Sequence, residues 1–348
     1  MKSILVITQK VDQEDDLLGF FVAWLREFAR SFDRVFVIAL AKGKYDLPSN
    51  VVINSLGKEK NAPKFIQAFR FYKLLFQLVP QADSIFAHMS PIFAIAAWPI
   101  TFIYGRKIVL WYLHRSVTPR LQFAEKLCAS IVTADKDSLQ LKSRKVVEVG
   151  HGIEVEKFRG EHDWNRTNPL RIISVGRISP IKNYETLIQA AYLLREKNFN
   201  FKVQIVGRPV IAGDLAYEQD LKKCITDLNL GDQIIFKGFV PHTQMPALYK
   251  EADMVVNLTP TGGIDKTNLE AMASGCITLT SNQVFRKYFG QYASQLIFEH
   301  NNAQDLADKI FDLARQTSEK KKNISDFLVN IAQSYSIPKV IAKISALL

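Results

Sequence analysis

The sequence predicts an α/β protein made of two Rossmann-like domains, each with a doubly wound parallel sheet. Short β-branched runs alternate with helical patterns along the chain, which is typical of parallel sheets covered by helices. The alternation pauses once, at the polar residues 158–169, which contain glycine and end in proline. With 348 residues the chain can bury two separate cores. We expect domains over 1–160 and 161–335, with a last helix at about 336–348 packing back onto the first.

The first domain is expected to hold seven strands and four intervening helices. The strands are apolar, mostly β-branched runs at 4–8, 35–40, 51–54, 84–87, 107–113, 130–133 and 146–149. The helices have apolar residues at spacings of three and four, at 20–30, 64–79, 92–104 and 120–127.

The second domain repeats the alternation. Its strands are expected at 171–175, 202–206, 234–237, 254–257 and 277–280. Its helices are expected at 184–195, 215–228, 243–250 and 269–273, with further ones from 303, near 324–334 and at 338–348. We expect the two sheets to face each other across a cleft. Since open α/β sheets bind ligands at the carboxyl ends of their strands, the residues that follow strands are the informative ones.

Composition narrows the function only in part. Residues 1–160 hold 23 lysines and arginines against 15 acidic residues, a net charge of +8, and the remainder holds 22 against 19, or +3. Such a surface attracts phosphates, nucleic acid or anionic lipid without choosing among them. Three cysteines without metal-type spacing indicate a reducing compartment. The short N-terminal apolar run predicts a first strand rather than a signal peptide, and the longest apolar stretch falls short of a membrane span. We expect a cytoplasmic protein, free or peripheral on the inner face of the membrane.

Two cations share the loop after the first strand of the second domain. The stretch SVGRISPIKN places Arg177 and Lys182 beside a helix N-terminus, where they could clamp a pyrophosphate and stabilise a departing nucleotide. Alternatively, Lys182 is a solvated loop residue and Arg177 caps a strand end.

A glycine-rich turn opens a helix in residues 257–281. Its unpaired backbone N–H groups and positive dipole end, together with Lys266 and Thr267, suit a phosphate or a polyhydroxylated ligand. Glu270 could accept hydrogen bonds from a ribose diol, or it could simply be a carboxylate in the first helical turn. After another strand, Gly238 and Phe239 could pair with a nucleobase edge or form only a turn.

These segments together resemble the family 4 retaining glycosyltransferases of GT-B fold, also called glycosyltransferase group 1. The resemblance runs from about 170 to 280 through SVGRISPIKNYETLIQAA, VGRP, IIFKGFVP, LYKEADMVVNLTP and LEAMASGC. It implies a metal-independent hexosyltransferase that moves a sugar, with retention, from a UDP- or GDP-linked donor to a glycan or lipid-linked acceptor. No cofactor is implied.

Carried over by position, the resemblance assigns the pyrophosphate to Arg177 and Lys182, the base to Gly238 and Phe239, and the ribose to Glu270. The complete set of expected donor-binding residues is Gly176, Arg177, Lys182, Gly207, Arg208, Gly238, Phe239, Gly263, Asp265, Lys266, Thr267, Asn268, Leu269 and Glu270.

The chain departs from the family pattern at one position. The family has a glutamate eight residues before the ribose glutamate, and this chain has Gly262 there. Asp265 stands nearby. Its carboxylate could take over a sugar hydroxyl or could form an ion pair with Lys266; we favour the sugar hydroxyl.

The first domain offers candidates for the acceptor side. His114 follows a strand end and could reach a sugar hydroxyl or the acceptor, so we expect it to act in catalysis with Arg177 and Lys182. A histidine after a strand can equally be a structural hydrogen-bonding group. The full set of acceptor-side candidates is Gly19, His88, His114, Arg115 and His151.

Asp135 and Asp137 match the Asp-x-Asp pattern that binds metal–nucleotide-sugar complexes in a different glycosyltransferase fold. Asp135 follows a strand and opens a helix, so N-capping explains it better, and we expect no metal.

The helix over Lys64–Val79 is unusually aromatic and basic. Its row of apolar residues at spacings of three and four is expected to face the core: Phe65, Ala68, Phe69, Tyr72, Leu75, Phe76 and Val79. A second row, Phe71, Leu74 and Leu78, lies among basic residues and could rest on an anionic membrane. Alternatively, the helix is deeply buried and its lysines extend to solvent.

Two other classes of function are compatible with these residues. A nucleotide-sugar epimerase or hydrolase could use the same two-domain frame without an acceptor. A non-catalytic protein that binds anionic lipid or nucleic acid would account for the charge. No run of aromatic and basic residues marks a nucleic-acid-binding sheet face, so we expect no nucleic-acid partner.

Overall fold

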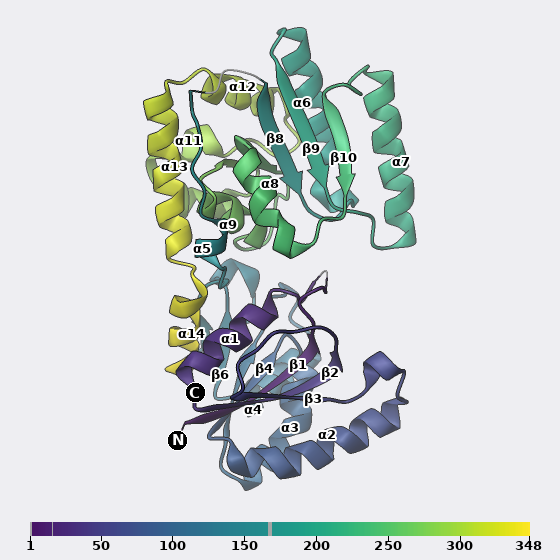
Figure 1. Ribbon diagram of the computed structural model, residues 1–348, viewed down its shortest axis with the longest axis vertical. Coiled ribbons are helices and arrows are strands. Elements are labelled where there is room, and N and C mark those ends of the chain that lie inside the picture. Colours follow the sequence, from purple (N-terminus) through teal and green to yellow (C-terminus); the bar gives the residue numbers. More distant parts are fainter. Residues whose placement is uncertain (1, 16, 166–168) are drawn as a thin grey trace. The chain divides into compact units, whose positions relative to one another are not determined.

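The computed structural model describes residues 2–15, 17–165 and 169–348 and divides the chain into two compact units (Figure 1). Unit 1 comprises Met1–Gly152 with Tyr335–Leu348, and unit 2 comprises Ile153–Ser334. Residues 166–168, in the predicted linker, lie outside the described residues. No helix of the described residues is both long enough and apolar enough to cross a bilayer.

Unit 1 holds a seven-stranded sheet in the order β3-β2-β1-β4-β5-β6-β7, with every neighbouring pair parallel. The strands are β1 (Ser3–Val11), β2 (Arg34–Lys42), β3 (Val51–Ser55), β4 (Ser84–His88), β5 (Lys107–Trp111), β6 (Ser130–Thr133) and β7 (Val146–Glu148). Its α-helices are α1 (Phe21–Ser31), α2 (Lys64–Leu78), α3 (Pro91–Ile103), α4 (Pro119–Leu127) and α14 (Ile337–Ser345). Short 3-10 turns are η1 (Lys58–Lys60), η2 (Val79–Gln81) and η3 (Lys136–Ser138). The predicted parallel sheet is confirmed.

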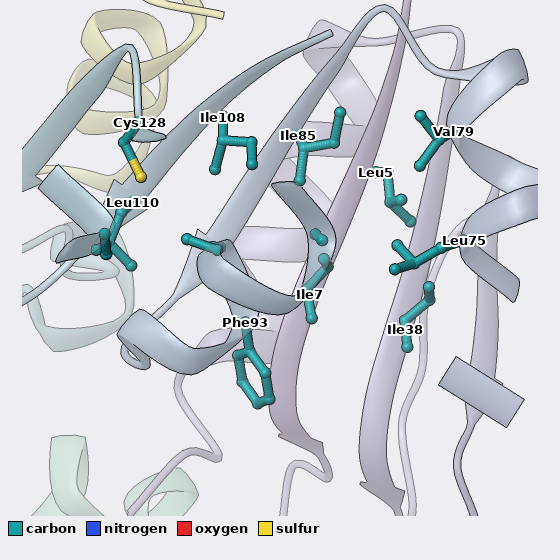
Figure 2. Packing of buried hydrophobic residues seen from close by; sticks show 14 of the residues in the cluster. Leu5, Ile7, Ile38, Leu75, Val79, Ile85, Phe93, Ile108, Leu110 and Cys128 are labelled. Carbon is teal, nitrogen blue, oxygen red and sulfur yellow. The ribbon is translucent and has the colours of Figure 1, made fainter. Parts of the chain in front are cut away.

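Both faces of this sheet are buried, because successive side chains of a strand point to opposite faces. Leu5 and Ile7 of β1 belong to the core that α2, α3 and α4 cover, and Figure 2 shows them beside Leu75 and Phe93 of those helices. Ile4 and Val6 face the second core, which α1 and α14 cover. Parallel strands buried on both sides explain the continuous apolar runs in the sequence.

Unit 2 holds a five-stranded parallel sheet in the order β10-β9-β8-β11-β12. The strands are β8 (Leu170–Val175), β9 (Phe201–Val206), β10 (Ile234–Gly238), β11 (Met254–Asn257) and β12 (Ile277–Thr280). The longer helices are α6 (Tyr184–Glu196), α7 (Ala212–Asp227), α8 (Met245–Glu251), α9 (Lys266–Ala273), α12 (Ala303–Ala314) and α13 (Ser318–Gln333). Single turns are α5 (Val155–Phe158), α10 (Arg286–Phe289), α11 (Ala293–Leu296), η4 (Pro180–Lys182), η5 (His242–Gln244), η6 (Gln283–Phe285) and η7 (Gly290–Tyr292).

The predicted orientation of α2 is wrong for its aromatic residues, although Leu75 and Val79 of the predicted row are buried as expected. Its buried residues are Phe71, Leu75 and Leu78, and the aromatic residues predicted to face the core are exposed: Phe65, Phe69, Tyr72 and Phe76. Both rows have helical spacing, so periodicity could not choose between them. The sheet decides, and the face of the helix that packs against it takes Leu75 from the first row and Phe71 and Leu78 from the second.

Candidate functional site

Three glycines end neighbouring strands of unit 2, and their loops are bonded to one another. The Gly207 amide donates to the Gly238 carbonyl at 2.9 Å, and the Gly176 amide donates to Val206 at 3.0 Å. Gly207 has φ +143°, and a Cβ added to it would lie 1.9 Å from the Gly176 carbonyl oxygen. A side chain at residue 207 would therefore force the two loops apart. Gly176 and Gly207 form a close-packed floor at the carboxyl edge of the sheet, and Gly238 is hydrogen-bonded to it.

Lys182 lies over this floor. A Cβ on Gly176 would be 3.0 Å from Lys182 Cε, so the lysine stem packs on the glycine. Its ammonium donates to Thr259 Oγ1 at 2.9 Å and contacts Asp265 Oδ2 at 3.4 Å. Arg177, from the same loop, is exposed. One predicted cation is thus held in place and the other is presented to solvent.

Asp265 caps helix α9. Its Oδ1 accepts from the Thr267 amide at 3.1 Å and the Thr267 hydroxyl at 2.8 Å, and its Oδ2 accepts from Asn257 Nδ2 at 2.9 Å. Burial opposes the charged carboxylate, but Lys182 and these hydrogen bonds outweigh it and hold the Asp265 pKa well below its ordinary value. The Asp265 carboxylate pairs with Lys182 rather than with Lys266, the alternative partner considered from the sequence, and its contact with a sugar hydroxyl stays a prediction.

Glu270 is the most deeply buried carboxylate of the predicted site, at 3% exposed. His242 Nε2 lies 2.8 Å from its Oε1, and Lys266 Nζ lies 3.4 Å from the same oxygen. Burial would raise the Glu270 pKa, yet the charge of Lys266 and the His242 hydrogen bond together lower it. Burial lowers the Lys266 pKa, against the attraction of Glu270. The site therefore holds a buried, charge-compensated carboxylate.

Asn268 and Leu269 follow in α9 and are fully buried. Neither amide atom of the Asn268 side chain has a hydrogen-bond partner among the described residues. A buried polar group left in this state costs about 1–3 kcal/mol. This side chain leaves donor and acceptor capacity unused within the predicted site, while Leu269 is a core residue.

A cation–aromatic pair stands at the ends of β9 and β10. The Arg208 guanidinium lies 4.8 Å from the centre of the Phe239 ring, and the ring is exposed. Gly238 precedes it with φ +75°, a conformation that favours glycine. The arrangement offers an exposed aromatic ring beside open space at Gly238.

The loop at Gly262 explains the missing carboxylate. Gly262 has φ +113°, and Asn282 Nδ2 donates to its carbonyl at 3.3 Å and to that of Gly263 at 3.2 Å. A side chain at 262 would be strained by this backbone conformation. The loop is built for glycine, so a glutamate could not be restored here without reshaping it.

Unit 1 has a pocket at the carboxyl ends of β4 and β5, with a volume of about 480 Å³. The loop after β5 supplies exposed His114, with exposed Arg115 next to it. The lining residues are Met89, Ser90, Pro91, Ile92, Tyr112, His114, Thr118, Pro119 and Arg120. His114 and Arg120 thus face one cavity beside the start of α4.

His88 does not reach this pocket's surface. It is the last residue of β4 and is fully buried, with Nδ1 3.0 Å from Thr8 Oγ1 and its ring 3.8 Å from that of Phe21. Burial lowers its pKa to about 3. The expectation that His88 follows the strand and lies on the acceptor side is wrong, because the strand continues through it and the ring is buried; His88 is a neutral core residue.

The other first-domain candidates lie in turns. Gly19 precedes α1, and its amide donates to the Asp15 carbonyl at 3.0 Å. A Cβ there would lie 2.7 Å from that carbonyl oxygen, so the turn requires glycine. His151 is partly buried between Gly150 and Gly152, which both have positive φ.

Three residues of the unit 2 site were missed by the sequence reasoning: His242, Asn257 and Thr259. Each contacts a predicted residue: His242 contacts Glu270, Asn257 contacts Asp265, and Thr259 contacts Lys182. All three follow or end a strand of the second sheet. Their position at the carboxyl edge was therefore the available signal.

Asp135 caps the 3-10 turn η3, with Oδ1 accepting from the Ser138 amide at 2.9 Å and Oδ2 from its hydroxyl at 2.8 Å. The N-cap explanation is confirmed. Within the described part of the chain, no group of three or more histidine, cysteine or acidic side chains is arranged to hold a metal.

Comparison with known proteins agrees with this geometry. Residues 155–327, half of the chain, match the family model for glycosyl transferases group 1. The alpha-monoglucosyldiacylglycerol synthase of Streptococcus pneumoniae is 26% identical over 62% of this chain and 54% of its own. The amylovoran biosynthesis glycosyltransferase AmsK of Erwinia amylovora is 34% identical over 37% and 32%. The chain thus spans about half or less of the curated relatives it matches.

The likeness in three dimensions extends over both units. The crystal structure of HepE from Anabaena in complex with UDP matches with a TM-score of 0.77 and 18% identity, covering 99% of each chain. At this identity the match establishes the fold, which is GT-B, with one parallel α/β sheet of seven strands and one of five. The resemblance found in the sequence is confirmed, and the chain belongs to the glycosyl transferases group 1 family.

Proposed function

We propose that this chain transfers a sugar from a UDP- or GDP-linked donor to a glycan or lipid-linked acceptor, with retention of configuration and without a metal ion. The proposal rests on two ion pairs at the carboxyl edge of unit 2, Lys182–Asp265 and Lys266–Glu270, which meet at consecutive residues of the chain. Family membership supports the reaction class.

Lys182 is placed to receive the donor diphosphate. Its ammonium rests against a carboxylate at the start of α9, where backbone N–H groups and the helix dipole favour anions. A bound diphosphate would compete with Asp265 for this ammonium, and exposed Arg177 would add a second cation. Both cations would stabilise the charge that develops on the departing nucleoside diphosphate.

Glu270 would hold the ribose. Its carboxylate is kept charged by Lys266 and His242, and a charged carboxylate accepts hydrogen bonds from a diol better than a neutral one. The Phe239 ring with Arg208 would support the base. Asn268 has the unused hydrogen-bonding capacity that a bound ligand could satisfy.

In the transfer step the bond from the sugar C1 to the diphosphate oxygen breaks, and a bond from C1 to the acceptor oxygen forms on the same face of the ring. The acceptor proton passes to a diphosphate oxygen, so charge and atoms balance without a further reactant. His114 would contact a sugar or acceptor hydroxyl from the unit 1 pocket.

We propose that unit 1 binds the acceptor, and that the lipid carrying this acceptor lies in an anionic membrane. The support is the pocket of about 480 Å³ beside His114 and the net charge of +8 in residues 1–160. Vesicle binding tests the membrane contact, and a screen of lipid-linked and soluble glycans tests the acceptor.

Lys182→Ala tests the transfer reaction. Loss of one such cation should lower kcat about a hundredfold, since each preorganised donor to a developing charge supplies about 3 kcal/mol. Lys309→Ala is the matched control, because Lys309 is 20% exposed and paired with Asp305 at 3.2 Å, much as Lys182 is 18% exposed and paired with Asp265. Near-normal turnover by Lys182→Ala, with an unchanged Tm, would contradict the role of Lys182 in the proposed transfer reaction. Conversion of donor without acceptor would indicate an epimerase or hydrolase.

A further inference from the structure

Helix α2 carries a row of exposed aromatic side chains, which we call the aromatic ridge: Phe65, Phe69, Tyr72 and Phe76. Their side chains are 72%, 69%, 43% and 57% exposed. Spacings of four, three and four place all of them on one side of the helix. The helix lies at the lower rim of unit 1 in Figure 1.

The aromatic ridge is not needed to pack α2 onto the sheet. The same helix buries Phe71, Leu75 and Leu78 against the sheet, so its docking is already provided by another row. Four large aromatic side chains on one helical face are unusual in a soluble protein, and contiguous apolar surface of this kind marks an interaction site.

Further apolar side chains are exposed at the C-terminal end of the neighbouring helix α3. Phe102 and Ile103 are 68% and 71% exposed, and Tyr104 follows. Helices α2 and α3 contact each other and cover the same face of the sheet. Two adjacent helices on this side of the sheet therefore both expose apolar side chains.

The charges around the ridge are almost all positive. Lys58, Lys60 and Lys64 precede it, Arg70 and Lys73 lie within the helix, and no acidic residue occurs between Lys60 and Asp83. Arg106 and Lys107 follow the exposed end of α3. A protein partner would have to supply both an apolar groove and acidic residues, whereas an anionic bilayer supplies hydrocarbon and negative charge together.

We propose that the aromatic ridge docks unit 1 on an anionic lipid bilayer, with α2 lying along the membrane surface. The rings would enter the interfacial region, where aromatic side chains are favoured, and the lysines would contact the head groups. This inference rests on the proposed function, because docking on the membrane would bring the enzyme to a lipid-linked acceptor. The binding itself does not require the transfer activity.

The test is flotation of the full-length protein with vesicles of phosphatidylcholine mixed with phosphatidylglycerol, compared with pure phosphatidylcholine. We expect binding to the mixed vesicles only. The double variant Phe69→Ser/Phe76→Ser should bind at least tenfold more weakly, with no loss of Tm, because both side chains are already in water. The matched control is Ile211→Ser/Leu215→Ser, which removes two apolar side chains of similar exposure, 66% and 56%, from unit 2. This control should bind as the wild type does.

Charge is tested with Lys64→Glu/Lys73→Glu, against Lys339→Glu/Lys343→Glu on α14, which covers the opposite face of the same sheet. Loss of each positive charge near the membrane surface should weaken vesicle binding about fivefold, and replacing that charge with a negative one should weaken binding further. Only the α2 variant should lose binding, and added salt should weaken the wild type.

Three results would overturn the proposal. The ridge variant could float as well as the wild type, the wild type could bind both kinds of vesicle equally, or sedimentation could show that the ridge variant dissociates an oligomer. A wild type that binds vesicles but transfers no sugar would instead contradict the proposed function alone.

Discussion

The carboxyl edges of the two sheets are built differently. In unit 2 the edge is crowded and polar: Lys182, Asp265, Lys266 and Glu270 form ion pairs over closely packed glycine loops. In unit 1 the edge is open, with exposed His114 beside a pocket of about 480 Å³ and His88 sealed in the core. The difference teaches that charged groups are already fixed by ion pairs at one edge, whereas the other edge keeps free volume beside an exposed histidine.

The largest effect is expected from Gly207→Ala. The new Cβ would overlap the Gly176 carbonyl oxygen at 1.9 Å, so the loops must separate, at about 4 kcal/mol or more. Gly213→Ala is the control, because it lies in helix α7 with nothing within 4 Å of the added Cβ, and it should be neutral or slightly stabilising. Chemical denaturation measures both. Equal stability of the two variants would show that the floor of the unit 2 site is not close-packed.

Two histidines of unit 1, His88 and His114, should separate stability from catalysis. His88→Ala leaves a cavity and an unpartnered Thr8 hydroxyl, and should lower the free energy of unfolding by about 3 kcal/mol. His114→Ala, at an exposed position, should leave Tm unchanged and lower kcat about a hundredfold if His114 contacts the reacting sugar or acceptor. Thermal unfolding and initial rates check the pair. Full activity of His114→Ala would remove it from the proposed reaction.

Asp265→Asn should give the smallest change in stability, about 1 kcal/mol, because an asparagine still caps α9 while the pairing with Lys182 is lost. The Asp265 pKa lies below its ordinary value of 3.8 in the folded protein. The carboxylate therefore stabilises the fold above about pH 4 and loses this contribution as the pH falls toward its folded pKa.

Urea titrations of wild type and Asp265→Asn at several pH values measure this dependence. The difference between the two proteins should be largest near neutral pH and should shrink in acid. A difference independent of pH would mean that the carboxylate charge contributes nothing to stability.

Much of the fold was readable from the sequence. Strands β6, β11 and β12 have their predicted limits, because buried parallel strands are short uninterrupted runs rich in apolar and β-branched residues. The predicted residues Lys182, Glu270 and Gly207 do come together in unit 2, because each follows a strand or opens a helix at the same edge. Their roles stay predictions.

Other features could not be read in this way. Helices α7 and α13 begin three and six residues before their predicted starts, because the residues of their first turns, 212–214 and 318–323, show no apolar period. Asp265 pairs with Lys182, which is 83 positions away in the sequence. From the sequence alone, the adjacent Lys266 was the nearer possible partner.

The sequence by itself determined the alternation of strands and helices and the order of residues along the unit 2 edge, because β-branched runs, glycines and capping residues act locally. Only the tertiary structure decided which row of α2 is buried, that His88 is a core residue, and which carboxylate meets which lysine. Those outcomes depend on which surfaces the sheets present to each side chain, and no spacing along the chain encodes them.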